Sequence, residues 1–413
     1  MFCRECGREV DPSSSFCAYC GADVSNGMEP TPRPIPAPRH MSLRPLAVIV
    51  LFVVIGTALL LAFLPDDDSI EKSYTVGDMT VYGDLVNAPI VIQDGMLVYS
   101  GQGTNVIWKY KDVHDTYYVK EGSVYVERGY TTDYNRFLRF DSPGSFLVVF
   151  SDSNGYYASG RVVVDGDITT EYRWNARLAG SNHYFTVTYT YRFSDFLAYA
   201  EDDVVRHDIR KADDDRFIQR DALMDNLLSS LKASYRSVFG SEASTSDQMF
   251  ADYLLSFVQY SITYPDPITE TAPHVLSKEG GVGDMFLYGD SEYWAYPIET
   301  IHHGYGDCED TSFLLASLYV KAGYTCSTPT IPGHMVVCVN LDELAYSWNY
   351  PGYYMTTLKL LDGRLMYACE TAIDYTNWAG NVALGYVNET THNDLLELTR
   401  LYVVEPEDAT DSR

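Results

Sequence analysis

The sequence predicts a multidomain chain: a small metal-binding module, one transmembrane helix, an all-β, sandwich-like region and a final α+β domain. Three observations carry this prediction. They are two Cys-x2-Cys pairs at the start, an uninterrupted apolar run of nineteen residues, and a change from strand-like to helix-like periodicity near residue 204. The length of 413 residues allows two or three soluble domains. The net charge of −28 falls on residues 66–413, and because phosphate binding requires excess Lys and Arg, we expect no nucleic-acid partner.

The first 24 residues contain Cys3-x2-Cys6 and Cys17-x2-Cys20, each pair directly followed by glycine. Four thiolates at this spacing are typical of a tetrahedral Zn²⁺ site, and glycine permits the tight turn after each pair. The alternatives are two disulfides, which a reducing cytosol disfavours, and a redox CxxC, which the presence of two matching pairs disfavours. We therefore expect residues 1–24 to fold around structural Zn²⁺. The segment resembles the short zinc-ribbon modules at the N-termini of many prokaryotic membrane proteins, and its partner is unknown.

Residues 25–45 and 46–64 differ sharply in composition. Alternating prolines predict an extended linker over 25–45. Residues 46–64 are apolar or small without a charge, which predicts a transmembrane helix; a buried helix and a cleaved signal peptide are the alternatives. Arginines precede the run and three aspartates follow it, so the positive-inside rule places the N-terminus in the cytoplasm. We expect a single-pass cell-membrane protein with residues 66–413 outside the cytoplasm.

Residues 70–204 are predicted to form the all-β region. Short alternating runs recur there, separated by turn dipeptides such as Asp94-Gly95 and Asp165-Gly166. An antiparallel sandwich or barrel is the expected result. Its many tyrosines fit half-buried strand faces, with wall-polymer binding as the functional alternative.

Residues 205–405 carry the candidate chemistry. Two amphipathic helices precede the stretch YPIETIHHGYGDCEDTSFLLASLYVKAG, in which Asp307 can cap a buried helix that begins at Cys308 and closes at Gly323. The N–H groups at a helix start favour a thiolate, whereas Glu309 and Asp310 oppose it. The thiol therefore needs a basic partner.

His334 follows a Pro332-Gly333 turn and starts an alternating strand, and Glu370 ends the second strand of a predicted hairpin around Asp362-Gly363. Neighbouring strands can present both side chains to the start of the Cys308 helix. The expected roles are Cys308 as nucleophile, His334 as general base and then acid, and Glu370 as the carboxylate that orients the imidazole.

These residues resemble the transglutaminase-like cysteine-enzyme superfamily, particularly its bacterial and archaeal branch. The likeness rests on GDCEDTS, YPIET, GHMVVCV and YACETA and covers roughly residues 205–385. It implies a papain-like α+β fold and thiol acyl transfer with no catalytic cofactor. The third position, often Asp in relatives, is Glu370 here. The resemblance also suggests Gln259, Trp294 and Tyr296 as oxyanion-hole or substrate side chains, although structural roles fit each of them as well.

The expected function is hydrolysis or acyl transfer at peptide or isopeptide amides of a protein or cell-surface polymer. A catalytically inactive binding or adhesion module is one alternative, and a membrane sensor coupled to the zinc ribbon is another. A disulfide among Cys326, Cys338 and Cys369 is compatible with the sequence, which does not select the pair.

Overall fold

The computed structural model describes fourteen segments of the chain. They are residues 73–87, 90–99, 105–111, 118–119, 123–124, 129–130, 137–140, 142–152, 157–206, 215–265, 284–288, 292–347, 350–372 and 381–406. The chain divides into two units, residues 1–59 and 60–413, and the described residues all belong to the second. The four predicted zinc ligands, the linker over 25–45 and the apolar run over 46–64 lie outside the described residues.

The first part of the second unit is built on an antiparallel sheet of six strands in the order β1-β2-β11-β10-β5-β8. These strands are β1 (Ser73–Val76), β2 (Met79–Tyr82), β5 (Asn105–Lys111), β8 (Gly129–Tyr130), β10 (Gly144–Asp152) and β11 (Tyr157–Val164). A second sheet contains β3 (Ile90–Gln93), β4 (Met96–Tyr99) and β9 (Phe137–Arg139), while β6 (Tyr118–Val119) pairs with β7 (Ser123–Val124) and a 3-10 turn covers Gly83–Asn87. Inward side chains of β2, β4, β10 and β11 form a small apolar core.

The predicted Asp94-Gly95 turn is confirmed. Both residues have positive φ, 51° and 72°, which is the backbone that a two-residue hairpin between Gln93 and Met96 requires.

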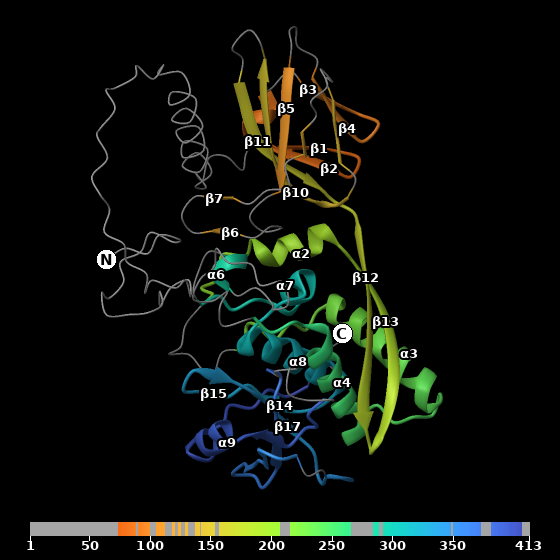
Figure 1. Ribbon diagram of the computed structural model, residues 1–413, viewed down its shortest axis with the longest axis vertical. Coiled ribbons are helices and arrows are strands. Elements are labelled where there is room, and N and C mark those ends of the chain that lie inside the picture. The colour runs from red at the N-terminus through yellow and green to blue at the C-terminus, as the bar shows by residue number, and fades with distance from the viewer. Residues whose placement is uncertain are drawn as a thin grey trace, which may run out of the picture. The chain divides into compact units, whose positions relative to one another are not determined.

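A long hairpin follows, made of β12 (Asp167–Leu178) and β13 (Ser181–Arg192), and its strands form a two-stranded sheet of their own. Its side chains alternate between buried and exposed over most of its length. The buried side packs on α3 (Ala222–Phe239) and α4 (Gln248–Ser261), beside which it runs in Figure 1. Trp174 illustrates this contact, since its ring lies 5.6 Å from that of Tyr253 and its Nε1 donates to Ser256 Oγ at 3.1 Å.

The remaining helices are α2 (Phe193–Ala200), α6 (Asp284–Leu287), α7 (Pro297–His303), α8 (Cys308–Ala322) and α9 (Glu389–Leu396). Helix α8 has the predicted bounds, with Asp307 as its N-cap residue and Gly323, with φ 96°, as its C-cap. The predicted capping by the Asp307 side chain is wrong, because that side chain makes no capping hydrogen bond. Every side chain from Cys308 to Val320 is buried, so α8 forms the centre of the largest core.

Small antiparallel sheets surround the end of this core. Strands β14 (Cys326–Ser327), β17 (Val337–Asn340), β20 (Leu365–Cys369) and β19 (Thr357–Lys359) form one sheet in that order; β15 (Thr330–Ile331) pairs with β16 (His334–Met335), and β18 (Tyr353–Met355) with β21 (Tyr386–Asn388). The predicted hairpin around Asp362-Gly363 is confirmed, because β19 and β20 pair Lys359 with Leu365 across it.

The predicted fold class is wrong. It combined a transmembrane helix, an all-β sandwich-like region and a separate papain-like α+β domain. The described residues instead have mixed α and β content with small sheets, and no helix among them is long and apolar enough to span a bilayer. Asp165-Gly166 is not a hairpin turn: β11 stays in the six-stranded sheet, and β12 leaves it to pair with β13. The physical reason is the large buried side chains of β12 and β13, which share one core with α3 and α4.

Candidate active site

A cavity of about 740 Å³ lies at the start of α8 and opens between this helix, the β15–β16 turn and α9. Both Cys308 and His334 line it. The full lining is Tyr264, Asp284, Glu292, Trp294, Asp307, Cys308, Glu309, Thr330, Ile331, Pro332, Gly333, His334, Met335, Asp394, Glu397 and Leu398.

Cys308 is the first residue of α8, and 8% of its surface is exposed. Gly306 makes this entry possible: a Cβ there would lie 2.8 Å from Asp310 Cβ and 2.9 Å from Thr300 Cγ2. Only glycine therefore lets the chain approach α7 and α8 this closely.

The β15–β16 hairpin positions His334. Ile331 pairs with His334 across the predicted Pro332-Gly333 turn, in which Gly333 has φ 66°. The imidazole Nε2 lies 3.1 Å from Glu370 Oε1 and 3.2 Å from Oε2. Since Glu370 engages Nε2, Nδ1 is the ring nitrogen that can serve a thiol.

Glu370 directly follows β20 and is 2% exposed. Its Oε1 accepts a hydrogen bond from Ala372 N at 3.1 Å. Gln259 on α4 fixes its backbone, because Gln259 Nε2 donates to Glu370 O at 2.7 Å and to Val382 O at 2.9 Å. The carboxylate beside His334 is thus held by its own loop and by a neighbouring helix.

Two side-chain contacts join α8 to the segments that carry the histidine and the carboxylate. Ser312 Oγ donates to Met335 O at 3.3 Å, and Thr311 Oγ1 lies 2.9 Å from Thr371 Oγ1. Each contact lies one to four residues from a predicted catalytic residue, so the three segments are packed as one unit.

The surroundings of His334 act on the pKa of its imidazole in opposite directions. Burial lowers the pKa of this imidazole, but the hydrogen bond and the charge of Glu370, with a smaller contribution from Asp307, outweigh burial and raise the pKa above its ordinary value. His334 is therefore a stronger base than an exposed histidine.

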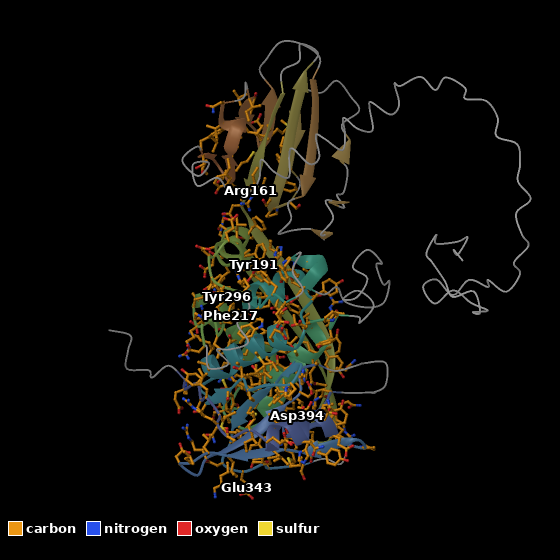
Figure 2. The ribbon with its side chains drawn as sticks, turned by 90° about the vertical axis from the view of Figure 1, so that its left-hand side faces the viewer. Arg161, Tyr191, Phe217, Tyr296, Glu343 and Asp394 are labelled. Atoms are coloured by element: carbon orange, nitrogen blue, oxygen red, sulfur yellow. The ribbon has the colours of Figure 1, made fainter. Side chains whose placement is uncertain are left out.

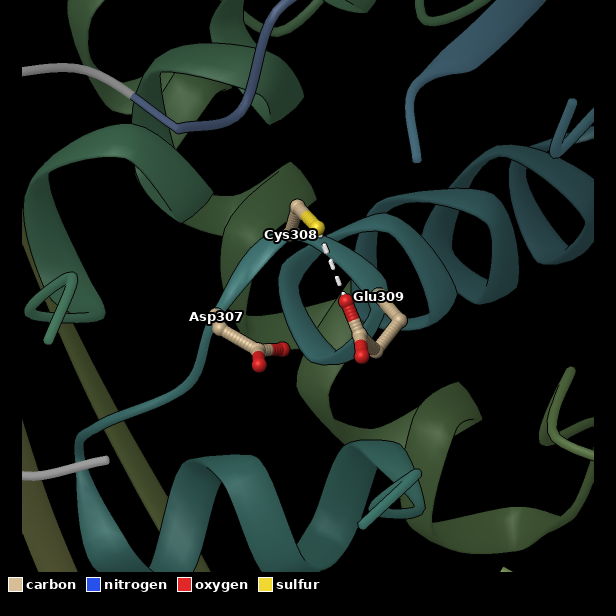
Figure 3. A group of neighbouring side chains, drawn as sticks. All are labelled: Asp307, Cys308 and Glu309. Carbon is tan, nitrogen blue, oxygen red and sulfur yellow. Dashed lines mark hydrogen bonds between the residues drawn. The ribbon is translucent and has the colours of Figure 1, made fainter. Parts of the chain in front are cut away.

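The Cys308 thiol lies in an acidic environment. It donates to Glu309 Oε2 at 2.8 Å, the contact drawn in Figure 3. Burial first, and then the charges of Glu309 and Asp307, raise the pKa of Cys308 far above its ordinary value. Among the contacts of the described residues, none is a hydrogen bond between Cys308 and His334. The thiol is neutral in this arrangement.

Several carboxyl groups lie around the start of α8, and the sequence predicted only those of Asp307, Glu309 and Asp310. Burial, and then the charge of Asp307, raise the pKa of Glu309 to about 10 and that of Asp310 well above its ordinary value. Asp284 and Glu292, from the segment before α7, line the same cavity and were missed. No local motif marks them, because only the tertiary fold brings them to α8.

The three residues suggested for an oxyanion hole lie in different places. Trp294 lines the cavity, and its Nε1 donates to Glu292 Oε1 at 3.2 Å. Both amide hydrogens of Gln259 are directed to backbone carbonyls, as described above. Tyr296 lies beside Phe217, away from the cavity lining, and its hydroxyl donates to Asp202 Oδ2 at 2.9 Å (Figure 2).

All four cysteines of the described residues, Cys308, Cys326, Cys338 and Cys369, are free and buried. The described part of the chain therefore contains no disulfide.

Comparison with known proteins identifies one module. Residues 2–24 match the zinc-ribbon domain family, a range that contains all four predicted zinc ligands and indicates zinc binding at the N-terminus. No curated protein and no solved structure matches the chain.

Proposed function

We propose that the chain is a thiol hydrolase or acyltransferase that attacks peptide or isopeptide amides through Cys308, His334 and Glu370. The observation that carries the proposal is the cavity that Cys308 and His334 share, with both oxygens of the buried Glu370 within 3.2 Å of His334 Nε2. The resemblance to transglutaminase-like cysteine enzymes supports the same roles for the same three residues.

The reaction begins with the neutral thiol. His334 Nδ1 accepts the Cys308 proton as the sulfur forms a bond to the amide carbonyl carbon, and Glu370 stabilises the imidazolium. The C–N bond then breaks, the leaving amine takes the proton from His334, and a thioester remains on Cys308. Water or a second amine then attacks the thioester carbon and gives a proton to His334. The C–S bond breaks, the acyl product leaves, and His334 returns the proton to the Cys308 sulfur.

The raised pKa of Cys308 gives His334 its importance in this scheme. Because the thiolate is disfavoured at rest, its formation has to coincide with proton transfer to a base whose own pKa is raised. The N–H groups at the start of α8 are suited to stabilise the oxyanion of the tetrahedral intermediate.

A catalytically inactive binding module is the second candidate. The observation that favours it is the contact of the Cys308 thiol with Glu309 Oε2, in place of a hydrogen bond to His334. In this alternative the cavity binds a peptide segment without cleaving it.

For the N-terminal module, we propose that Cys3, Cys6, Cys17 and Cys20 supply the four thiolates that hold Zn²⁺. Their spacing fits a closed tetrahedral site with a structural role. Zinc content of the purified chain, measured in wild type and in Cys3→Ser, tests this assignment.

The test of catalysis is labelling of the full chain with iodoacetamide near pH 8, followed by peptide mass mapping. A working thiol is labelled first at Cys308, before the other buried cysteines, and slowly in His334→Ala. Labelling of Cys308 at the same rate in both proteins contradicts the proposal and favours the binding module. Cys308→Ala controls for the site assignment.

A further inference from the structure

A group of three carboxylates adjoins the candidate active site but supplies no group that makes or breaks a bond in the proposed reaction. Asp284 begins α6, Asp307 is the N-cap residue of α8, and Asp310 lies in the first turn of α8. One carboxylate oxygen from each lies within 4.8 Å of those of the other two. Two segments of the chain, the start of α6 and the start of α8, thus converge on one small volume.

Backbone hydrogen bonds fix the orientation of two of these carboxylates. Tyr293 N donates to Asp284 Oδ2 at 2.6 Å, and Ala295 N donates to Asp310 Oδ1 at 2.8 Å. Both donors belong to the same extended segment before α7, so the two carboxylates are held against each other by one stretch of backbone.

Asp310 provides the second, independent observation. Its side chain is completely buried, and its Oδ2 has no hydrogen-bond partner among the described residues. A buried carboxylate oxygen without a donor is costly, and a bound cation satisfies it. The same Asp310 carboxyl group lies close enough to Asp307 and Asp284 for the charges of both to raise its pKa.

We propose that Asp284, Asp307 and Asp310 form a binding site for one hard divalent cation, with Ca²⁺ as the best match. Carboxylate oxygens are the ligands that hard cations prefer, in contrast to the thiolates of the zinc ribbon. Ca²⁺ accepts irregular oxygen geometry, whereas Mg²⁺ demands a near-ideal octahedron, so carboxylates that the backbone already orients suit Ca²⁺ better.

The cavity provides the rest of the coordination shell. Asp284 and Asp307 line it, so water from the cavity can complete the six to eight oxygens that Ca²⁺ takes. Asp310 closes the site from the protein interior. The proposal goes beyond the proposed reaction and does not depend on it, because ligand binding here requires neither Cys308 nor His334.

The experiment uses the zinc-loaded full chain and Tb³⁺, a luminescent substitute for Ca²⁺ that nearby Tyr293 and Trp294 can sensitise. Ca²⁺ is then titrated as a competitor. Wild type and Cys308→Ala should bind one ion with equal affinity, and Asp310→Asn and Asp284→Asn should each bind at least about tenfold more weakly. Asp394→Asn is the matched control, because Asp394 on α9 lines the same cavity outside the cluster (Figure 2).

Three results would overturn the proposal: no binding in wild type, equal affinity in wild type and both cluster variants, or an equal loss in Asp394→Asn. Thermal unfolding of each variant checks that it folds; if Asp310→Asn does not, Asp284→Asn decides the outcome. Preference for Mg²⁺ over Ca²⁺ would overturn the choice of cation. Since the readout is binding, inactivity of the enzyme leaves the result interpretable.

Discussion

The candidate site has two walls, one formed by β16 with the end of β20 and the other by the start of α8, and they differ in how buried charge is balanced. On the β16–β20 side, the single buried carboxylate of Glu370 lies beside the imidazole of His334 and raises its pKa. On the α8 side, several carboxyls gather around a thiol, and the pKa values of Cys308, Glu309 and Asp310 all rise. In the proposed reaction, the imidazole is therefore suited to accept a proton, whereas the thiol is neutral until the proton is transferred.

Removal of the base should have the largest effect on this contrast. We expect His334→Ala to slow alkylation of Cys308 at pH 8 by about 10²-fold or more, because general-base assistance contributes on that scale. Quenched time courses with intact-protein mass spectrometry measure the rate. His183→Ala, on the β12–β13 hairpin, is the control. A similar rate in His334→Ala and wild type would show that His334 does not act as the base for Cys308.

Neutralising its carboxylate should have a smaller effect. Glu370→Gln keeps a hydrogen-bond acceptor near Nε2 but removes the charge that raises the pKa of His334. We expect a rate about tenfold lower on the plateau. The pH at which alkylation sets in should also move down, because the imidazole then loses its proton at lower pH. A pH–rate profile tests both effects, and an unchanged midpoint would mean that Glu370 does not act on His334.

Asp252 on α4 lies in neither wall, and burial is what raises the pKa of its carboxyl. It therefore shows the effect of burial without that of neighbouring charges. Desolvation raises its pKa to about 7, although it accepts hydrogen bonds from Tyr346 Oη at 2.6 Å and from Leu384 N at 2.7 Å. The folded protein therefore keeps a proton that the unfolded chain loses near pH 4. The contribution of Asp252 to the free energy of unfolding is complete below pH 4 and is lost as the pH rises to 7. The loss is up to about 1.4 kcal/mol per pH unit.

Asp252→Asn should flatten the pH dependence of the free energy of unfolding between pH 4 and 7, measured by urea titration. Asp342→Asn, at an exposed position, is the control. The same pH dependence of the free energy of unfolding in Asp252→Asn and wild type would show that burial does not raise the pKa of Asp252.

The hydroxyl contact between the walls should give the smallest effect. Thr371→Val removes the buried contact with Thr311, and we expect a loss of about 1 kcal/mol in the free energy of unfolding. Thr169→Val, which breaks an exposed pair with Thr190, is the matched control and should cost less. Equal losses in the two variants would show that the contact does not join the walls.

Local signals predicted the parts of the site that depend on neighbouring residues. Two-residue turns predicted His334 at the start of a strand and Glu370 next to the end of another, and the positions of Asp307 and Gly323 predicted the bounds of α8. These features follow from backbone preferences of a few adjacent residues.

Features that depend on distant packing were not predicted. The hairpin of β12 and β13 was assigned to an all-β region because alternation does not specify which surface buries the strand. Asp284 and Ala295 reach Asp310 only through tertiary contacts. The role of Gln259 in holding the backbone of Glu370 was likewise invisible, since 111 residues separate them.

The central claim is that Cys308 forms a thioester with an acyl donor. Its most direct test is intact-mass measurement after incubation of the full chain with p-nitrophenyl esters of N-acyl amino acids, followed by neutral hydroxylamine. We expect an acyl adduct on Cys308 that hydroxylamine removes, that is absent in Cys308→Ala and that is strongly reduced in His334→Ala. No adduct in wild type, or an adduct of equal yield in His334→Ala, would contradict it.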